Sequence, residues 1–283
     1  MLQQPLADLP AWTARLAAAR IPVQAVTADD LALLAQAEAV RGDVDAHQLS
    51  PTVSRDPLAA LRLLASAAQM RQQRRVDDNY GGPETVTAAL VMMGIGPFFR
   101  EFESPQTVEQ LLGEKPLALA GLQRVIRRAH RAADFALGFA VQRMDDDAAV
   151  LQLAALLHDF AEMLLWCHAP GLALQIQAQQ MADPALRSAA AQRTVLGIEL
   201  PALQHALMQQ WALPELLVRI SDDSQGDDLQ VQNVQLAIRL ARHTEDPALG
   251  WQNPAVPDDL KAIAELLGFS YAATETLVRD IDA

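Results

Sequence analysis

An apolar stripe with the period of an α-helix runs through residues 117–144 and constrains the fold more than any other feature of the chain. Residues three and four positions apart lie on the same face of a helix. The stripe consists of Leu122, Val125, Ile126, Ala129, Ala133, Ala136, Leu137 and Ala140. No segment shows the sustained alternation of a β-strand, so other helices must cover this stripe. We therefore expect an all-α protein.

Composition supports this fold class. Ala and Leu account for 95 of the 283 residues, against 27 Ile plus Val and 13 aromatic residues. Ala and Leu are strong helix formers, whereas β-branched and aromatic residues favour strands. The single cysteine, Cys167, excludes an intramolecular disulfide and a cysteine-rich zinc site. We expect this thiol to be inert, because it follows Trp166 at the apolar end of a helix.

The charge balance limits the classes of partner. The net charge of −13 argues against a broad nucleic-acid footprint, which requires many cations to neutralise phosphates. The first residues lack the basic segment and apolar run of a secretory signal. The longest segment without Asp, Glu, Lys or Arg, residues 163–182, contains Pro170, Gly171 and several glutamines, which disfavour a membrane span. We expect a cytoplasmic protein with no nucleic-acid or membrane partner.

The pattern of helices and loops predicts two contiguous lobes, residues 1–104 and 105–283. Residues 101–116 mix Glu, Ser, Pro and Gly and form the candidate boundary, with a short helix at 108–112. A helix is expected around Leu31 with Thr27 or Asp29 as its N-cap. Further predicted helices follow Asp56-Pro57, cover 85–93 and 117–144, run from Asp145-Asp146-Asp147 to His158-Asp159, and cover 172–181, 184–196, 201–211, 214–220, 231–243, 258–267 and 271–281. Residues 71–82 are expected to form a loop.

The dipeptide His158-Asp159 is the main candidate for chemistry. A histidine and an aspartate at the end of an apolar helix are costly to bury unless they pair or share a metal ion. His130 lies 28 residues upstream, and antiparallel packing of the two helices brings it alongside. Such a set suits zinc, manganese, iron or nickel and can activate water against a phosphoester. Glu162, four residues after His158, is a candidate substitute ligand.

A structural alternative exists for the same residues. Asp159 can accept a hydrogen bond from His130 or from backbone amides while His158 bridges two helices. We expect no catalytic residue and no resident cofactor on this interpretation, with a divalent transition metal as the alternative.

An arginine ridge precedes and follows His130. Arg127 and Arg131 are candidate ligands for an anion or a nucleotide phosphate, together with their neighbours Arg124 and Arg128. Pairing with Asp145, Asp146 and Asp147 or with other carboxylates of this acidic chain is the competing interpretation. A second acidic run, at residues 222–228, lacks the alternating ligands of a calcium loop, and we expect it to be solvated.

The order and spacing of several motifs resemble the HDOD family, the HD-related output domain of bacterial signalling proteins. The resemblance covers residues 21–251. It rests on Ile21-Pro22, Val53-Ser54-Arg55-Asp56-Pro57-Leu58, Leu61 to Ala67, Thr85 to Gly94, His130, Leu156-Leu157-His158-Asp159 and Gln210-Trp211-Ala212-Leu213-Pro214. The resemblance implies an all-α fold with a C-terminal HD-like lobe, distantly related to metal-dependent phosphohydrolases.

The chain departs from the family pattern at the remaining ligand positions. Ala161-Glu162 stands where Gly-Lys is common, Glu199 where a further histidine is common, and Ser221 to Ser224 where a His-His pair is often seen. No carboxylate stands at Ala237-Ile238-Arg239, near the expected closing aspartate. Only His130, His158 and Asp159 of the usual set are therefore present.

The resemblance implies a bacterial signal-transduction output or scaffold module that acts by binding signalling proteins or a small ligand, and the incomplete ligand set is consistent with this role. A nucleotide is the ligand class considered. The alternative is a metal-dependent phosphohydrolase of the HD type that acts on a nucleotide or phosphoester through His130, His158 and Asp159. The oligomeric state is left open by the sequence.

Overall fold

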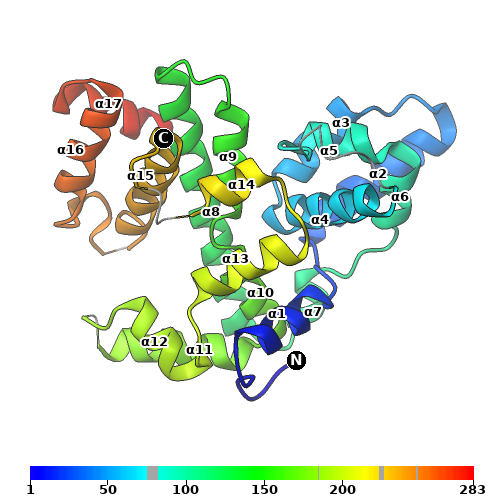
Figure 1. Cartoon of the computed structure of the whole chain (residues 1–283), viewed down its shortest axis with the longest axis horizontal. Helices are drawn as coiled ribbons and strands as arrows, with labels where there is room; N and C mark the ends of the chain where they lie inside the picture. The colour runs from blue at the N-terminus through cyan, green and yellow to red at the C-terminus, as the bar shows by residue number, and fades with distance from the viewer. Residues whose placement is uncertain (75–81, 184, 223–225, 247) are drawn as a thin grey trace. The chain divides into compact units, whose positions relative to one another are not determined.

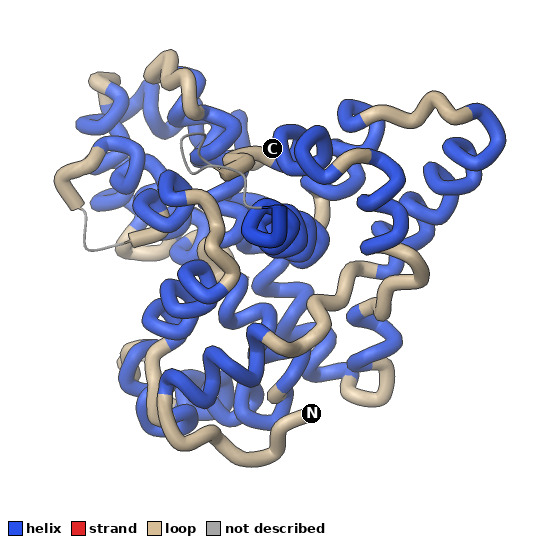
Figure 2. The backbone as a smooth tube through the Cα atoms, turned by 45° about the vertical axis from the view of Figure 1, so that its right-hand side comes forward, coloured by secondary structure: helices blue, strands red, loops and turns tan. Residues whose placement is uncertain are grey.

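The computed structural model confirms the all-α prediction. It describes residues 1–74, 82–183, 185–222, 226–246 and 248–283. Within these ranges the regular elements are helices, and the sole β-type pairing is an isolated bridge between Val23 and Thr107 (Figure 2).

The helices follow the chain in the order shown in Figure 1. They are α1 (Leu9–Ala17), α2 (Ala25–Arg41), α3 (Ala46–Ser54), α4 (Pro57–Arg74), α5 (Val86–Met93), α6 (Ile95–Glu101), α7 (Val108–Leu112), α8 (Pro116–Gln142), α9 (Ala148–Leu157), α10 (Phe160–His168), α11 (Pro170–Ala182), α12 (Ser188–Leu196), α13 (Leu200–Gln210), α14 (Glu215–Ile220), α15 (Leu229–His243), the 3₁₀ helix η1 (Gly250–Gln252), α16 (Val256–Leu267) and α17 (Tyr271–Ile281). The first part of the predicted loop at 71–82 is helical, because α4 continues to Arg74. Residues 75–81 lie outside the described ranges.

The chain divides into two compact units, and each contains two separate segments. Unit 1 comprises Met1–Ile126 and Asp159–Pro214, and unit 2 comprises Arg127–His158 and Glu215–Ala283. These units differ from the contiguous lobes 1–104 and 105–283, because the segment after residue 104 packs against the N-terminal helices. The amide of Val23 donates to the Gln106 carbonyl at 3.0 Å, and the amide of Val108 donates to the Val23 carbonyl at 2.9 Å.

The start of α2 is set by side chains from distant segments. The predicted N-caps Thr27 and Asp29 are wrong, since Gln24 is the N-cap and makes no side-chain capping bond. Instead, the amide of Gln24 donates to Oδ2 of Asp56 at 2.7 Å, and the amide of Ala25 donates to Oε2 of Glu109 at 2.9 Å. Carboxylates are favoured at a helix N-terminus, where they satisfy amides that have no intrahelical partner.

Asp56 also begins α4, as its position before Pro57 predicts. The amides of Leu58 and Ala59 donate to Oδ1 of Asp56 at 2.9 and 3.2 Å. The side chain is fully buried, and burial raises the pKa of its carboxyl group above 3.8 against the opposing effect of these hydrogen bonds. One buried carboxylate therefore joins the starts of two helices in unit 1.

In unit 1, α10 packs against α4, α7, α11 and α13, and α1 packs against α13. Trp12 and Trp166 are among its largest buried side chains. Gly121 allows close packing of α8 on α10, because a Cβ atom there would lie 2.5 Å from Cη2 of Trp166. In unit 2, α15 packs against α9, α14 and α16, and α16 packs against α17.

The segment Ala148–His168 is interrupted after ten residues. It forms α9 and α10, with His158 and Asp159 in the turn between them. Within the described ranges it is the one stretch long and apolar enough to cross a membrane, and 72 % of its most apolar window is buried in the protein. Such burial is typical of a core helix.

Candidate functional site

The predicted metal ligands lie on three consecutive helices. His130 is on α8, His158 is the C-cap of α9, Asp159 is the N-cap of α10, and Glu162 lies in the first turn of α10. All four side chains are half-buried. His130 and His158 belong to unit 2, whereas Asp159 and Glu162 belong to unit 1.

Local interactions account for two of these residues. Nε1 of Trp166 donates to Oε1 of Glu162 at 3.5 Å, one helical turn away. His130 interacts electrostatically with Asp134, also one turn away. Burial raises the pKa of Asp134, the His130 imidazole lowers it, and the nearby Asp282 carboxylate raises it.

Among the residues that the structure describes, no group of three or more His, Cys, Asp or Glu side chains is placed to hold a metal ion. Because His130 and His158 belong to one unit and Asp159 and Glu162 to the other, the predicted three-ligand centre, with Glu162 as a substitute, stays a prediction. Each of the four residues takes part in another polar or electrostatic interaction.

Carboxylates pair with Arg128 and Arg131 of the arginine ridge on α8. Arg131 makes a bidentate ion pair with Asp282, from Nε to Oδ1 at 2.7 Å and from Nη2 to Oδ2 at 2.8 Å. Nη1 of Arg128 lies 3.2 Å from Oε2 of Glu245. Arg127 is exposed. These two pairs agree with the competing interpretation, in which the arginines pair with carboxylates of this chain, although the carboxylates come from the C-terminal segment.

Arg131 also donates hydrogen bonds to Ala241 in α15 and to Thr244, the C-cap of that helix. Nη2 donates to Oγ1 of Thr244 at 2.7 Å, and Nη1 donates to the Ala241 carbonyl at 3.4 Å. Asp282 in turn accepts a hydrogen bond from Nε1 of Trp251 at 3.2 Å. The predicted anion site at Arg131 is thereby filled by a carboxylate of the same unit. Neither Asp282 nor Trp251 is part of a motif, so sequence reasoning did not identify them.

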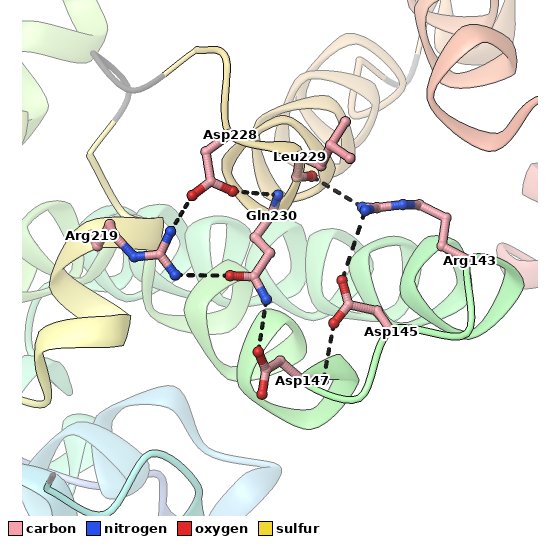
Figure 3. A network of polar contacts seen from close by, with 7 residues as sticks. All are labelled: Arg143, Asp145, Asp147, Arg219, Asp228, Leu229 and Gln230. Atoms are coloured by element: carbon pink, nitrogen blue, oxygen red, sulfur yellow. Dashed lines mark hydrogen bonds and ion pairs between the residues drawn. The ribbon is translucent and has the colours of Figure 1, made fainter.

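Two acidic segments of the sequence meet in one network at the start of α15 (Figure 3). Asp228 is the N-cap of this helix and accepts from the Gln230 amide at 2.8 Å. Nε2 of Gln230 donates to Oδ2 of Asp147 at 2.8 Å. Arg219 donates to Oε1 of Gln230 at 2.9 Å and is paired with Asp228. These carboxylates are engaged within unit 2, while Asp223 lies outside the described ranges.

A buried carboxylate in unit 2 was also missed. Asp259 on α16 is fully buried and lies 2.5 Å from Nδ1 of His243 and 2.7 Å from Nη2 of Arg239, both on α15. The spacing of Arg239 and His243, four residues apart on one helix face, is the only signal that could have indicated a shared partner.

Cys167 is fully buried in α10. Burial, followed by the charge of Asp56, raises the pKa of its thiol. Because the thiolate is the reactive form, the predicted inert cysteine agrees with this environment.

The comparisons with known proteins identify the family. The family model of the HDOD domain matches residues 27–225. No curated protein matches the chain. The structure of the response regulator MmoQ from Methylococcus capsulatus strain Bath aligns with a TM-score of 0.64 at 16 % identity, covering 93 % of this chain and 99 % of that chain.

A virulence factor from Campylobacter jejuni subsp. jejuni aligns with a TM-score of 0.62 at 14 % identity, covering 95 % of this chain and 98 % of that chain. At such identities these likenesses show the fold alone. The family match spans most of the sequence and agrees with the motifs around Asp56, His158 and Trp211. The chain belongs to the HDOD family.

Proposed function

We propose that this protein is a non-catalytic signal-transduction module that acts by binding signalling proteins or a small ligand. The observation that carries the proposal is the pairing of Arg131, the candidate anion ligand, whose guanidinium donates hydrogen bonds to Asp282 and Thr244. In addition, no group of three or more His, Cys, Asp or Glu side chains among the described residues is placed to hold a metal ion. Membership of a family of output domains and the likeness in fold to a response regulator support a signalling context.

The alternative is hydrolysis of a phosphoester. Metal-dependent hydrolysis requires a cation that lowers the pKa of a bound water and stabilises charge on the phosphoryl oxygens. His130, His158 and Asp159 are the residues this chemistry would use here. On the basis of its net charge of −13, we assign the protein no nucleic-acid partner.

Metal analysis combined with phosphatase assays separates the two functions. The purified protein, with and without added Mn²⁺, Zn²⁺, Fe²⁺ or Ni²⁺, is compared with His158→Ala, Asp159→Ala and the matched control His205→Ala, which removes an exposed histidine of α13. We expect substoichiometric metal and background turnover in all four proteins. Stoichiometric metal together with turnover, both lost in His158→Ala and Asp159→Ala but kept in His205→Ala, would overturn the proposal.

Binding is tested by thermal shift and by partner capture. A screen of nucleotides and cyclic dinucleotides measures whether any ligand raises the melting temperature, since a ligand that binds only the native state stabilises it. Capture from the native host tests for a signalling protein. A reproducible shift or a partner confirmed with purified components supports the module. Failure of both would remove its support.

A further inference from the structure

Helix α2 exposes an apolar ridge. Only Thr27 and Leu31 of this helix are buried. The exposed fractions of Val26, Leu33 and Val40 are 62 %, 64 % and 85 %. The exposed positions of the helix are Val26, Asp29, Ala32, Leu33, Gln36, Ala39, Val40 and Arg41, and most of them are apolar. An ordinary surface helix has the reverse pattern, with polar residues on its solvent side.

The spacing of the ridge is that of a helix-pairing surface. Val26, Leu33 and Val40 are each seven residues apart, so they form one row that drifts by only about 20° per heptad. Ala32 and Ala39, which are also exposed, stand directly before Leu33 and Val40 and are likewise seven residues apart. A seven-residue apolar repeat lets two α-helices keep contact along their length. We propose that a second copy of this chain occupies the ridge, with the two α2 helices antiparallel about a two-fold axis at Leu33.

The ridge is self-complementary in shape. Leu33 lies midway between two valines, so a two-fold axis at Leu33 sets Val26 of each copy against Val40 of the other. Leu33 then meets its own equivalent. A closed contact of this kind uses the same patch on both copies, as expected for an isologous dimer.

The charges favour the antiparallel arrangement. Asp29 and Asp30 lie in the first half of α2, and Gln36, Glu38 and Arg41 lie in the second half, where Oε2 of Glu38 already accepts from the Val44 amide at 2.9 Å. Antiparallel pairing brings the acidic half of one copy to Gln36 and Arg41 of the other, whereas parallel pairing would oppose Asp29 to itself. Arg41 is available for this exchange, because its present ion pair with Asp43 is exposed and such pairs contribute little.

The size of the surface predicts a weak dimer. A helix of this length spans about 26 Å, and two such helices bury less than the roughly 800 Å² per partner of a standard interface. Sedimentation equilibrium from about 1 to about 500 µM covers the range expected for a contact of this size. We expect the weight-average mass to rise from 30.7 kDa towards twice that value with concentration. A mass that stays at 30.7 kDa throughout would overturn the proposal.

Charge variants at the axis identify the interface. Leu33→Glu and Leu33→Lys should each shift the association curve at least about tenfold to higher concentration, and an equimolar mixture should restore association because opposite charges then meet. Met181→Glu, which changes an exposed methionine of α11, is the matched control and should leave the curve unchanged. Association that survives Leu33→Glu, or that the mixture does not restore, contradicts the interface. Circular dichroism checks that each variant is folded.

Cross-linking tests the orientation. The native thiol of Cys167 is buried, so single cysteines can be placed on α2 and joined with a short bismaleimide. Leu33→Cys should cross-link to itself. Val26→Cys should cross-link to Val40→Cys in a mixture but not to itself. Self-linking of Val26→Cys would instead indicate parallel helices and refute the antiparallel arrangement about Leu33.

Discussion

His168 makes the stability of unit 1 sensitive to acid. It ends α10, its Nε2 is buried without a hydrogen-bond partner among the described residues, and its carbonyl accepts from the Leu2 amide at 2.7 Å. Burial, followed by the charge of Arg15, lowers the pKa of the imidazole from 6.5 to about 4, against a hydrogen bond with the Arg20 backbone. The folded protein therefore resists protonation that the unfolded chain accepts.

The sign and size of the effect follow from linkage. Below pH 6.5 the unfolded state binds more protons than the folded state, so the free energy of unfolding falls as the pH falls towards about 4. At 1.36 kcal/mol per pKa unit, we expect His168 to cost about 1 kcal/mol at pH 6, about 2 kcal/mol at pH 5 and about 3 kcal/mol at pH 4.

Urea unfolding at pH 7.5, 6, 5 and 4, followed by tryptophan fluorescence, measures this loss against His168→Asn. The asparagine keeps a donor near the Arg20 backbone but does not titrate. At pH 7.5 the variant should be less stable than the wild type, and this deficit should shrink as the pH falls. By pH 4 the difference in the free energy of unfolding should have moved by about 3 kcal/mol in favour of the variant. His205→Asn should track the wild type. A constant difference between wild type and His168→Asn over this range would refute the argument.

Three further substitutions test the packing and the buried charges. Gly121→Ala should cost about 1–3 kcal/mol in urea unfolding, because its Cβ would lie 2.5 Å from the Trp166 ring. A double-mutant cycle of Arg131→Ala and Asp282→Ala should give a coupling free energy of about 1–2 kcal/mol, since the ion pair is bidentate but its side chains remain partly exposed to solvent. Asp56→Asn should cost about 1–3 kcal/mol at neutral pH, because its amide cannot accept both sets of backbone donors. Since burial raises the pKa of Asp56, the wild type should gain stability over this variant as the pH falls through the folded-state value towards 3.8.

Each of these substitutions has a control or a contradicting result. Gly171→Ala, where a Cβ atom meets nothing within 4 Å, should not destabilise α11, so equal losses at Gly121 and Gly171 would refute the close-packing argument. Additive effects at Arg131 and Asp282, measured by the same unfolding assay, would show that their ion pair contributes nothing. An Asp56→Asn deficit that does not change with pH would contradict the raised pKa.

Elements with strong local signals were predictable from the sequence. The apolar stripe and uninterrupted helix formers of 117–144 produce α8 within two residues of the expected ends. Asp56 before Pro57 marks the start of α4 correctly, because the cap is local. The start of α2 was not predictable, since Asp56 and Glu109 determine it across 32 and 84 residues.

The candidate site shows the same limit. The turn at His158-Asp159 could be located by its polar residues in an apolar segment. Whether ligands converge there depends on how helices pack, which residue spacing does not determine. The partner of Arg131 illustrates this, because Asp282 lies 151 residues away and outside every recognisable motif.

The saturation of Arg131 also constrains any anionic ligand of unit 2. A phosphate that binds this guanidinium must displace Asp282, which gives up a bidentate pair and leaves a half-buried carboxylate beside Asp134. That exchange costs on the order of 1–3 kcal/mol, or about five- to 150-fold in affinity, before the phosphate gains anything. Binding at Arg131 would therefore be coupled to release of the C-terminal end of α17, whereas the exposed Arg127 offers no such coupling. An anion site at Arg131 therefore works only by moving the C-terminal end of α17.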